Sequence, residues 1–343
     1  MASVIYLTDT RYGQQAWQHP SARHRCYHYA DSLLSHGCNS VVFPMERVSI
    51  ALLKGFDHAV FHRPSQNNRF KHALQCCNAV GLKLHADYDD LIFHPDFAQY
   101  SPQHLSSGKS VSRIKRQFTD TYNAAKSFAS FLVSTDYLAD KMIDVFPNVS
   151  VTVLPNSLPR TFTAPCQKNI NKEKLTIGYF PGSRGHSADF KSVIPALSAV
   201  ESEVVRILIV GRMNEEDYAG LKNVKHLPFA LYADYLKLLS HVDVSIAPLL
   251  NNEFNQSKSA VKLIESVSVG TPIVATENRD MADHNNDLSY LVGKGCQWQD
   301  ALRDALEKSL AKRNDIQTIG ELQKRFSVTS RLPILLEHLQ CAA

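Results

Sequence analysis

Short apolar runs rich in valine and isoleucine alternate with segments of helical periodicity from one end of this chain to the other. A parallel strand buried on both faces has such an apolar run, and parallel neighbours need a crossover, usually a helix. The alternation therefore predicts the α/β class, with parallel sheets covered by helices on both faces. In the first half we expect strands at 4–7, 40–43, 58–61, 82–85, 131–134 and 151–154, and helices at 22–35, 68–80, 111–130 and 136–145.

A polar stretch that contains Pro155, Pro159 and Pro165 separates the two halves of the chain. The 343 residues exceed what one hydrophobic core usually serves, so we expect two domains of about 150 residues each. The first predicted domain, at 1–160, is Rossmann-like and lies on the acceptor side, and a linker follows at 161–174. The second, at 175–325, is also Rossmann-like and binds the nucleotide sugar. A last helix at 326–343 can cross back to the first domain.

The second half repeats the alternation of the first. We expect strands at 175–180, 205–210, 224–227, 242–247 and 272–275, and helices at 189–199, 232–240, 257–269, 298–326 and 332–339. Two Rossmann-like domains in tandem face each other across a cleft between the carboxyl ends of their sheets, where doubly wound folds bind ligands. The segment 87–108 is too long for an ordinary connection, and we expect an acceptor-side loop there.

Charge and cysteine content exclude some classes of partner and compartment. The 37 basic and 33 acidic residues leave a net charge of +4, too small to indicate nucleic acid but compatible with phosphorylated ligands or an anionic membrane. The 7 scattered cysteines without a CxxC pair favour a reducing compartment. Without a leader-like start or an apolar run of about 18 residues, we expect a cytoplasmic protein. Basic residues on the helix at 111–128 leave peripheral membrane attachment open, although a solvated helix face is the simpler explanation.

The segment 258–276 carries the strongest functional signal. On a helical wheel Lys258, Lys262 and Glu265 fall within about 60°, opposite an apolar arc. Asn255 or Ser257 can cap the start of this helix, Gly270 can end it in the left-handed conformation, and Pro272 prevents its continuation. The wheel alone favours a surface helix with a Lys262–Glu265 pair.

The segment as a whole, from Lys258 through Glu265 to Gly270 and Pro272, resembles the donor-binding segment of family 4 and related GT-B glycosyltransferases. The resemblance implies that Glu265 accepts hydrogen bonds from the ribose of a nucleotide sugar, and that the helix start faces the sugar or diphosphate. The family signature is Glu-x7-Glu, and Ser257 stands where its first glutamate contacts the donor sugar. The donor sugar therefore stays unidentified.

A glycine-rich turn after the strand at 175–180 resembles the diphosphate loop of polysaccharide-assembly glycosyltransferases. Its glycines let backbone N–H groups converge on an anion, and an arginine adds a fixed charge. The predicted donor-binding residues in this region are Gly182, Ser183, Arg184 and His186, with Arg212 after the next strand. A plain tight turn and a solvent-facing Arg212 are the alternatives.

Two stretches of the first domain resemble the same glycosyltransferases. Arg23 and Arg25 open a helix, where basic groups oppose the macrodipole and thus indicate an acceptor or donor phosphate. The stretch 87–94 supplies Asp87, Asp89, Asp90 and His94 as candidate catalytic residues, with one carboxylate as general base. Metal binding by Asp-x-Asp, as in GT-A enzymes, and helix capping by Asp90 are the competing interpretations. Arg63 follows the third strand; a structural role is the first interpretation, and a place in the lining of the cleft is the alternative.

The resemblance implies a glycosyltransferase that moves a sugar from a nucleotide sugar to a glycan or lipid-linked glycan, in bacterial surface polysaccharide assembly. It favours retention of configuration, no metal, and no cofactor besides the donor substrate. An inverting reaction would need a base from Asp87, Asp89 or Asp90. A nucleotide-sugar epimerase of the same fold and an inactive pseudo-transferase that acts as a partner subunit remain alternatives. A dinucleotide-dependent dehydrogenase is disfavoured, because no strand precedes a complete GxGxxG.

Overall fold

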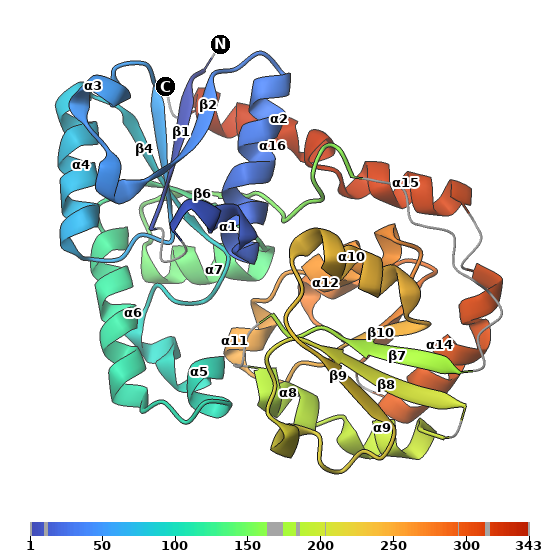
Figure 1. The fold of residues 1–343 in the computed structure, drawn as a ribbon. Helices are drawn as coiled ribbons and strands as arrows, with labels where there is room; N and C mark the ends of the chain where they lie inside the picture. The colour runs from blue at the N-terminus through green and yellow to red at the C-terminus, as the bar shows by residue number, and fades with distance from the viewer. Residues whose placement is uncertain are drawn as a thin grey trace.

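Two six-stranded parallel sheets with helices on their faces make up the protein (Figure 1). The structure, a computed structural model, describes residues 2–9, 13–162, 174–182, 186–202, 204–293, 295–312 and 316–341. The strands of the first sheet are β1 Val4–Thr8, β2 Ser40–Pro44, β3 His58–His62, β4 Lys83–Tyr88, β5 Ser130–Val133 and β6 Ser150–Val153. Those of the second sheet are β7 Leu175–Tyr179, β8 Val205–Val210, β9 Val224–Leu227, β10 Val244–Ala247, β11 Ile273–Thr276 and β12 Ser289–Val292.

Helices connect the strands in both halves. The first half contains η1 Gly13–Gln18, α1 Pro20–Ala22, the π-helical turn η2 Arg23–Tyr27, α2 His28–Ser35, η3 Met45–Arg47, α3 Ile50–Leu53, α4 Asn68–Val80, η4 Pro95–Tyr100, α5 Pro102–Leu105, α6 Val111–Ala125 and α7 Asp136–Val145. The second half contains α8 Ser187–Lys191, α9 Ile194–Val200, η6 Glu215–Asp217, α10 Tyr232–His241, α11 Glu253–Gln256, α12 Val261–Ser268, α13 Arg279–Asp283, α14 Trp298–Lys312, α15 Ile316–Phe326 and α16 Val328–Cys341.

The strand order fixes where ligands can bind. The first sheet runs β2-β1-β3-β4-β5-β6, and the second runs β12-β11-β10-β7-β8-β9, with all pairs parallel. The direction of winding reverses between β1 and β3 in one sheet and between β7 and β10 in the other. At such a reversal the loops after neighbouring strands part and leave a crevice at the carboxyl edge. The two-domain α/β prediction is confirmed.

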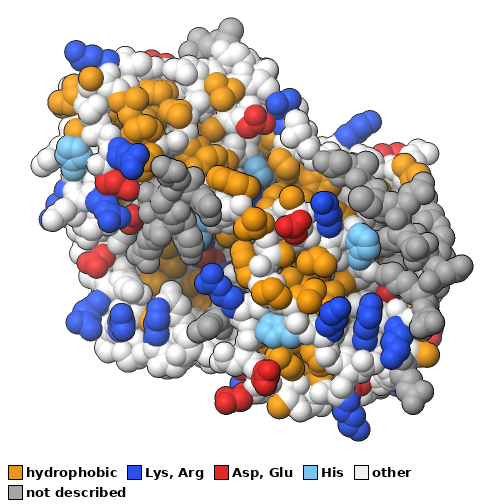
Figure 2. All heavy atoms as spheres, in the orientation of Figure 1, with side chains coloured by type: hydrophobic (Ala, Val, Ile, Leu, Met, Phe, Trp, Pro, Cys, Tyr) orange, Lys and Arg blue, Asp and Glu red, His pale blue; other side chains and the backbone are white. Residues whose placement is uncertain are grey.

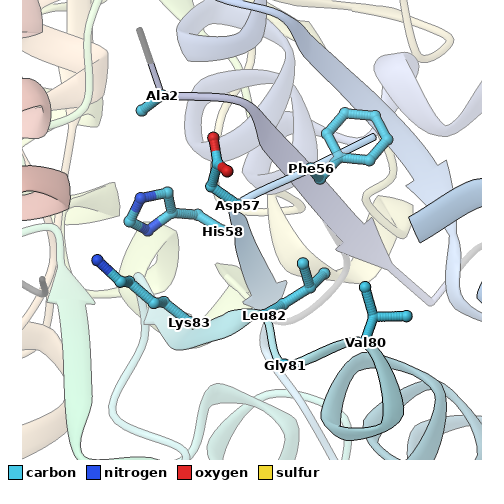
Figure 3. A pocket seen from close by; sticks show the side chains of 8 residues that line it. All are labelled: Ala2, Phe56, Asp57, His58, Val80, Gly81, Leu82 and Lys83. Atoms are coloured by element: carbon cyan, nitrogen blue, oxygen red, sulfur yellow. The ribbon is translucent and has the colours of Figure 1, made fainter. Parts of the chain in front are cut away.

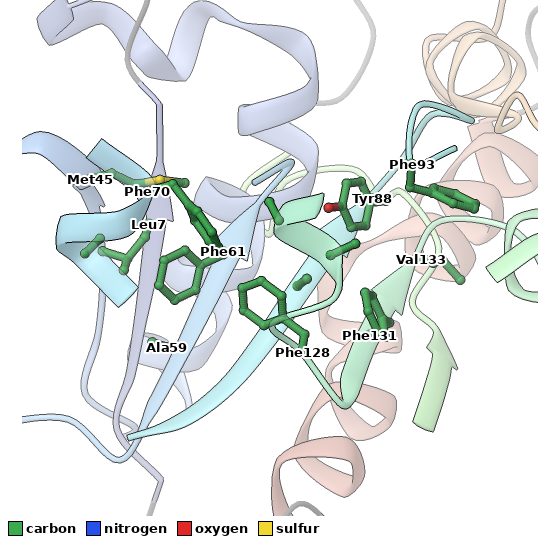
Figure 4. Close-up of a cluster of buried hydrophobic side chains, with 14 of the residues drawn as sticks. Leu7, Met45, Ala59, Phe61, Phe70, Tyr88, Phe93, Phe128, Phe131 and Val133 are labelled. Carbon is green, nitrogen blue, oxygen red and sulfur yellow. The ribbon is translucent and has the colours of Figure 1, made fainter. Parts of the chain in front are cut away.

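Each sheet has its own hydrophobic core. In the first domain the central strands bury an aromatic cluster in which Phe61 packs edge-to-face against Phe70 and Phe128 (Figure 4). A separate core fills the second domain around Ile177, Ile207 and Val244, which are fully buried. Burial of this apolar surface, at about 25 cal/mol per Å², is the main force that holds each domain together. Each domain thus has the rigidity needed to hold a site at its edge.

The chain crosses between the domains twice, and the two crossings pair with each other. The N–H of Leu158 donates to the carbonyl of Phe326 at 2.8 Å, and the N–H of Val328 donates to the carbonyl of Leu158 at 2.9 Å. After the second crossing, α16 returns to the first domain, where it packs against α2 (Figure 1). There Leu335 and Leu339 lie in the same buried cluster as Val4 and Tyr6 of β1. The last helix therefore belongs to the core of the first domain.

Some predicted elements differ from the structure. Strand β12 and helix α13 had not been predicted, and the helix expected at 257–269 begins only at Val261. The helix expected at 22–35 contains the π-helical turn η2, which inserts an extra residue into its first turns. The segment 87–108 is not a bare loop, because it forms η4 and α5. It reaches the second domain, where Ser106 Oγ accepts a 3.2 Å hydrogen bond from the N–H of Ala188.

Candidate active site

The carboxyl edges of the two sheets meet directly. Across this boundary Nζ of Lys258 lies 2.6 Å from Oδ1 of Asp90. Asn156 Nδ2 donates to Ser259 Oγ at 2.8 Å. Residues that follow β4 and β6 in one domain thus contact the segment just before α12 in the other. Some of the candidate residues, among them Asp90 and Lys258, thus meet at the boundary between the domains.

The start of α12 is capped from a distant part of the chain. The N–H of Ala260 donates to Oδ2 of Asp280 at 2.5 Å, so neither Asn255 nor Ser257 caps this helix as expected. Ser257 is fully buried, and its hydroxyl donates to the carbonyl of Phe254 at 2.7 Å. Ser257 therefore does not present its side chain to a ligand. The other end agrees with the prediction, since Gly270 has φ 72.

Glu265 is buried between the domains, so the alternative of a solvent-exposed surface pair with Lys262 does not hold. Its side chain accepts a 2.8 Å hydrogen bond from Tyr235 at Oε2, while Nε2 of His24 lies 3.4 Å from Oε1. No hydrogen bond reaches Oε1 among the described residues. Burial alone would raise the pKa of Glu265, but His24, Lys262 and Arg23 lower it to about 2. The carboxylate is ionised and has acceptor capacity left.

Lys262 lies beside Glu265 on a half-buried face of α12. Its ammonium group is 4.6 Å from the centre of the Tyr235 ring, a cation–π contact. Burial lowers the pKa of Lys262, and the charge of Glu265 opposes that shift. The lysine and the carboxylate therefore share one face, as the helical wheel predicted, but that face points at the first domain.

Arg23 and Arg25 both lie in the π-helical turn η2, but their side chains have different surroundings. The guanidinium of Arg23 lies 3.7 Å from the centre of the Tyr232 ring, and its Nε has no hydrogen-bond partner among the described residues. Arg23 is thus at the domain boundary, close to Glu265. Its unpaired, buried N–H is a donor that an anion could use.

Arg25 points the other way, into the first domain. Its Nε donates to Oδ1 of Asp87 at 2.9 Å and its NH2 group donates to Oδ2 at 2.7 Å, with a further contact to the carbonyl of Leu154. Both side chains are completely buried. This position does not favour Arg25 as a phosphate ligand or Asp87 as a catalytic base, because each charge is buried against the other. The pair is a bidentate buried salt bridge that joins η2 to β4.

Asp89 and Asp90 are held by cations rather than left free. Arg63 pairs with Asp89 and lies 2.6 Å from Asp90, and Asp90 also pairs with Lys258. Burial alone would raise the pKa of both carboxyls, but the charges of Arg63 and Lys258 lower it. Arg63 has a left-handed backbone, φ 47, which is uncommon outside glycine and typical of functional sites. Arg63 shares Asp90 with Lys258 of the other domain, which favours the alternative that it lines the boundary.

His94 is a helix cap. Its Nδ1 accepts a 3.3 Å hydrogen bond from the N–H of Asp96 at the start of η4, and its ring packs edge-on against Tyr122. The prediction of His94 as a catalytic residue is not supported by this position, because local contacts account for the side chain. Among the described residues no group of His, Cys, Asp and Glu is arranged to hold a metal ion.

Part of the predicted diphosphate loop can be placed. Ser183 and Arg184 lie outside the described residues. Gly182 follows β7, and Nδ1 of His186 lies 2.9 Å from Oδ2 of Asp189. Oδ1 of Asp189 accepts hydrogen bonds from the N–H of Leu250 and from Nδ2 of Asn255. This network ties the ends of β7 and β10 together at the reversal of the sheet.

Arg212 follows β8 with an exposed side chain, 5.7 Å from the centre of the Phe229 ring. It is therefore at the carboxyl edge of the second sheet, as predicted. Nothing in its contacts ties it to Glu265.

Three residues of the boundary were not predicted to belong to the site: His24, Tyr232 and Tyr235. Tyr232 and Tyr235 are one turn apart on α10, and their rings stack with centroids 6.2 Å apart. Their i, i+3 spacing could have indicated that they share a face. The contact of His24 with Glu265 joins residues that are remote in sequence, and no local pattern reveals it.

A separate pocket of about 440 Å³ lies at the opposite edge of the first sheet (Figure 3). Ala2 and residues 56–58 and 80–83 line it, at the amino ends of β3 and β4. Asp57 on its wall is already bonded to the N–H and hydroxyl of Ser3. The pocket is therefore not part of the site at the carboxyl edges.

Comparison with known proteins agrees with this geometry. Residues 175–312, which include β7 to β12 and α12, match the family described as Glycosyl transferases group 1. The fold of the whole chain is similar to that of Anabaena HepE in complex with UDP-glucose, with a TM-score of 0.63, 14% identity, and coverage of 99% of this chain and 100% of that one. This is the GT-B glycosyltransferase fold. The family match and the fold together indicate an enzyme that transfers glycosyl groups.

Two further solved structures are similar to this GT-B chain. Sucrose-phosphate synthase from Thermosynechococcus elongatus has a TM-score of 0.64 at 12% identity, covering 99% of this chain and 100% of that one. WaaG, a glycosyltransferase involved in lipopolysaccharide biosynthesis, has a TM-score of 0.59 at 14% identity, covering 96% of each chain. At these identities the likeness concerns the fold. No curated protein matches the chain.

Proposed function

We propose that this GT-B glycosyltransferase takes a sugar from a nucleotide-activated donor, which it binds at Glu265, and transfers it to a glycan or lipid-linked glycan. The observation that carries the proposal is the ionised carboxylate of Glu265, buried at the carboxyl edge of the second sheet with no hydrogen bond to Oε1 among the described residues. A buried, under-satisfied carboxylate calls for hydrogen-bond donors, and the hydroxyls of a ribose supply them. The fold matches HepE, whose structure holds UDP-glucose, and this match favours a uridine nucleotide as the first probe.

We propose that Lys258 binds the diphosphate. It shortly precedes α12, whose N-terminal dipole also favours negative charge. Lys258 pairs with Asp90 across the boundary, and its side chain is 22% exposed, so a competing anion can reach it. Arg23, with its unpaired Nε, is the second candidate for an anionic group. Stabilisation of the leaving diphosphate by such cations is the expected source of catalysis.

The proposed reaction proceeds with retention and without a metal. An inverting transfer needs a carboxylate that can take a proton from the acceptor hydroxyl. Asp87 is sealed in its pair with Arg25, while Arg63 and Lys258 lower the pKa of Asp89 and Asp90, which makes them weak bases. Because the proposed reaction uses no metal ion, activity should survive treatment with a chelator. Loss of activity in EDTA that Mg²⁺ or Mn²⁺ restores would contradict this part of the proposal.

Acceptor delivery at a membrane is compatible with the first domain. The outward face of α6 exposes Arg113, Lys115 and Arg116, and Leu105 of α5 is 43% exposed close to it. In Figure 2 basic side chains stand in a row in the region where Figure 1 shows α5 and α6. No helix in the described chain has the length and apolarity to cross a bilayer. We propose that the protein binds peripherally to anionic lipid and takes part in the assembly of a bacterial surface polysaccharide. Sedimentation of the protein with anionic but not with zwitterionic vesicles tests the binding to lipid.

A thermal-shift panel of nucleotides and nucleotide sugars tests donor binding. We expect at least one nucleoside diphosphate to raise the melting temperature of the wild type. Glu265→Gln should abolish that shift, because a neutral amide is a poorer acceptor for two hydroxyls. Glu321→Gln, on an exposed part of α15, is the matched control and should keep the shift. An equal shift in Glu265→Gln would remove Glu265 from the site, and the absence of any shift would overturn the proposal.

A pseudo-transferase that serves as a partner subunit is the second candidate. The observation in its favour is the complete burial of Ser257, which leaves no carboxylate where the family signature places its first glutamate. Nucleotide binding without transfer or hydrolysis of any donor would support this candidate. An epimerase of the same fold would convert the donor sugar in the absence of an acceptor.

A further inference from the structure

Two charged residues proposed to bind the donor are already paired with the first domain. Lys258 is bound by Asp90 at 2.6 Å, and Oε1 of Glu265 faces Nε2 of His24 at 3.4 Å. His24 and Glu265 are both nearly inaccessible, with side chains 4% and 3% exposed. A ribose therefore cannot reach this oxygen while His24 is in place.

The hydrogen bonds of His24 determine which of its nitrogens carries a proton. The carbonyl oxygen of Ser157 lies 3.0 Å from Nδ1 of His24 and 2.9 Å from Nδ1 of His28. A carbonyl can only accept, so both Nδ1 atoms must donate. A neutral His24 then has a lone pair at Nε2, and this lone pair would face the carboxylate oxygen. The two would repel each other, so the contact is favourable only when Nε2 is protonated as well.

The surroundings of His24 contain charges of both signs. Arg23 and His28 lie on its own helical segment, Tyr232 and Tyr235 come from α10, and Lys262 and Glu265 come from α12. The His28 ring is in edge contact with His24, with centroids 5.0 Å apart, and burial lowers the pKa of His28 well below its usual value. His28 is therefore neutral. Glu265 is the carboxylate that faces the protonated Nε2.

We infer that His24 is a specificity-determining residue of the donor site, because its imidazolium occupies Oε1 of Glu265 and a ligand must replace it there with a hydrogen-bond donor. The inference rests on the proposed binding of a nucleotide at Glu265. A ligand that displaced His24 without offering a donor would leave a buried carboxylate oxygen unpaired, which is costly. Free ribose hydroxyls meet this requirement, and an anion alone does not. His24 thus favours a nucleotide over phosphate or diphosphate that lacks a nucleoside.

The exchange makes donor affinity depend on the side chain at position 24. A side chain that does not reach Oε1 of Glu265 leaves this oxygen to the ribose, so its introduction should strengthen the binding of UDP.

Two substitutions at His24 separate its two hydrogen bonds. His24→Asn keeps a donor near Nδ1 for Ser157 but has nothing at Nε2, so it should bind UDP about tenfold more tightly than the wild type. His24→Gln places a neutral donor near Nε2 and should bind with intermediate affinity. His28→Asn is the control, because His28 shares the Ser157 contact without reaching Glu265. It should keep the wild-type affinity for UDP.

Isothermal titration of the full chain with UDP, with GDP in parallel, gives these values, and circular dichroism verifies that each variant is folded. Equal UDP affinity of the wild type and His24→Asn would overturn the inference, even if Glu265 binds the nucleotide. Equal binding of inorganic diphosphate and UDP would also overturn it. If neither nucleotide binds to the wild type or to His24→Asn, the proposed function itself fails.

Discussion

Nζ of Lys258 lies 2.6 Å from Oδ1 of Asp90, and the two residues belong to different domains. Lys258 precedes α12 of the second domain, and Asp90 follows β4 of the first. Both side chains are partly exposed, so the pair itself contributes only about 0.5–1 kcal/mol to stability. The pair matters because it holds the Lys258 ammonium group where we propose that the diphosphate of the donor binds.

Replacement of Lys258 by methionine should weaken binding of a nucleoside diphosphate by about tenfold, because one charge-assisted contact is lost. Binding of the nucleoside alone should change little. The measurement is isothermal titration with UDP and uridine. Lys225→Met, at an exposed position on β9, is the control and should match the wild type. Equal UDP affinity for Lys258→Met and the wild type would place the diphosphate elsewhere.

The buried Arg25–Asp87 pair yields a prediction about stability. Asp87→Asn leaves the Arg25 charge without its partner, and we expect a loss of about 3–5 kcal/mol in the free energy of unfolding. Urea denaturation followed by circular dichroism measures it. In the double variant with Arg25→Met, part of the loss should be recovered, since no buried charge remains unpaired. A stable Asp87→Asn protein without activity would instead restore Asp87 as a catalytic residue.

His58, His85 and His338 form a network between the first sheet and α16, and this network predicts how the free energy of unfolding depends on pH. Nδ1 of His58 is 3.1 Å from Nε2 of His85, and Nε2 of His338 is 3.0 Å from Nδ1 of His85. Burial lowers the pKa of His85 to about 3 and that of His338 to about 4, so the unfolded chain binds protons first as the pH falls. Stability should be full above about pH 6.5 and fall below it, by up to about 1.4 kcal/mol per pH unit for each such histidine.

Urea titrations between pH 7 and pH 5 test this prediction, since ordinary carboxyl groups titrate below that window. His338→Asn keeps a donor or acceptor for the Thr152 hydroxyl, which lies 2.8 Å from Nδ1 of His338, and removes one titrating ring. Its stability should decline less steeply than that of the wild type. Parallel slopes would show that His338 does not couple the last helix to pH.

Gly211 precedes Arg212 and has φ +148, a conformation that side chains rarely adopt. A Cβ atom there would lie 2.6 Å from the carbonyl oxygen of Pro181, next to Gly182. Gly211→Ala should therefore lower the free energy of unfolding by about 2 kcal/mol or more and weaken nucleotide binding. Gly320→Ala is the control, because nothing lies within 4 Å of its Cβ position on α15 and alanine favours the helix. A melting temperature of Gly211→Ala at or above that of the control would contradict the argument.

The sequence was sufficient for the sheets and most helices because their signals are local. Helices α4 and α7 begin and end where the apolar periodicity places them. Strand β12 was missed, since most of its residues are only half-buried and lack a continuous apolar run. The start of α12 was misplaced because its cap, Asp280, comes from a later helix.

The sequence was sufficient to identify several residues of the candidate site, but not to show which charged groups contact each other. Lys258 and Glu265 were identified by their spacing and by family resemblance, and both lie at the domain boundary. Arg25 and Asp87 were also identified as site residues, yet they neutralise each other inside the first domain. They are far apart in sequence, so the pattern marks both charges without showing which group faces which. His24 was not predicted for the same reason, because its contact with Glu265 joins residues that are far apart in sequence.

The return of α16 to the first domain has a consequence for the order in which the protein is made. Leu335 and Leu339 complete the cluster around Val4 and Tyr6, but the ribosome synthesises them only after the entire second domain. During translation α2 can cover part of this cluster early, but the part that α16 covers stays exposed until the last helix has been synthesised. Such a long-range closing contact raises the contact order and slows folding. We expect the nascent first domain to depend on chaperones until its last helix arrives.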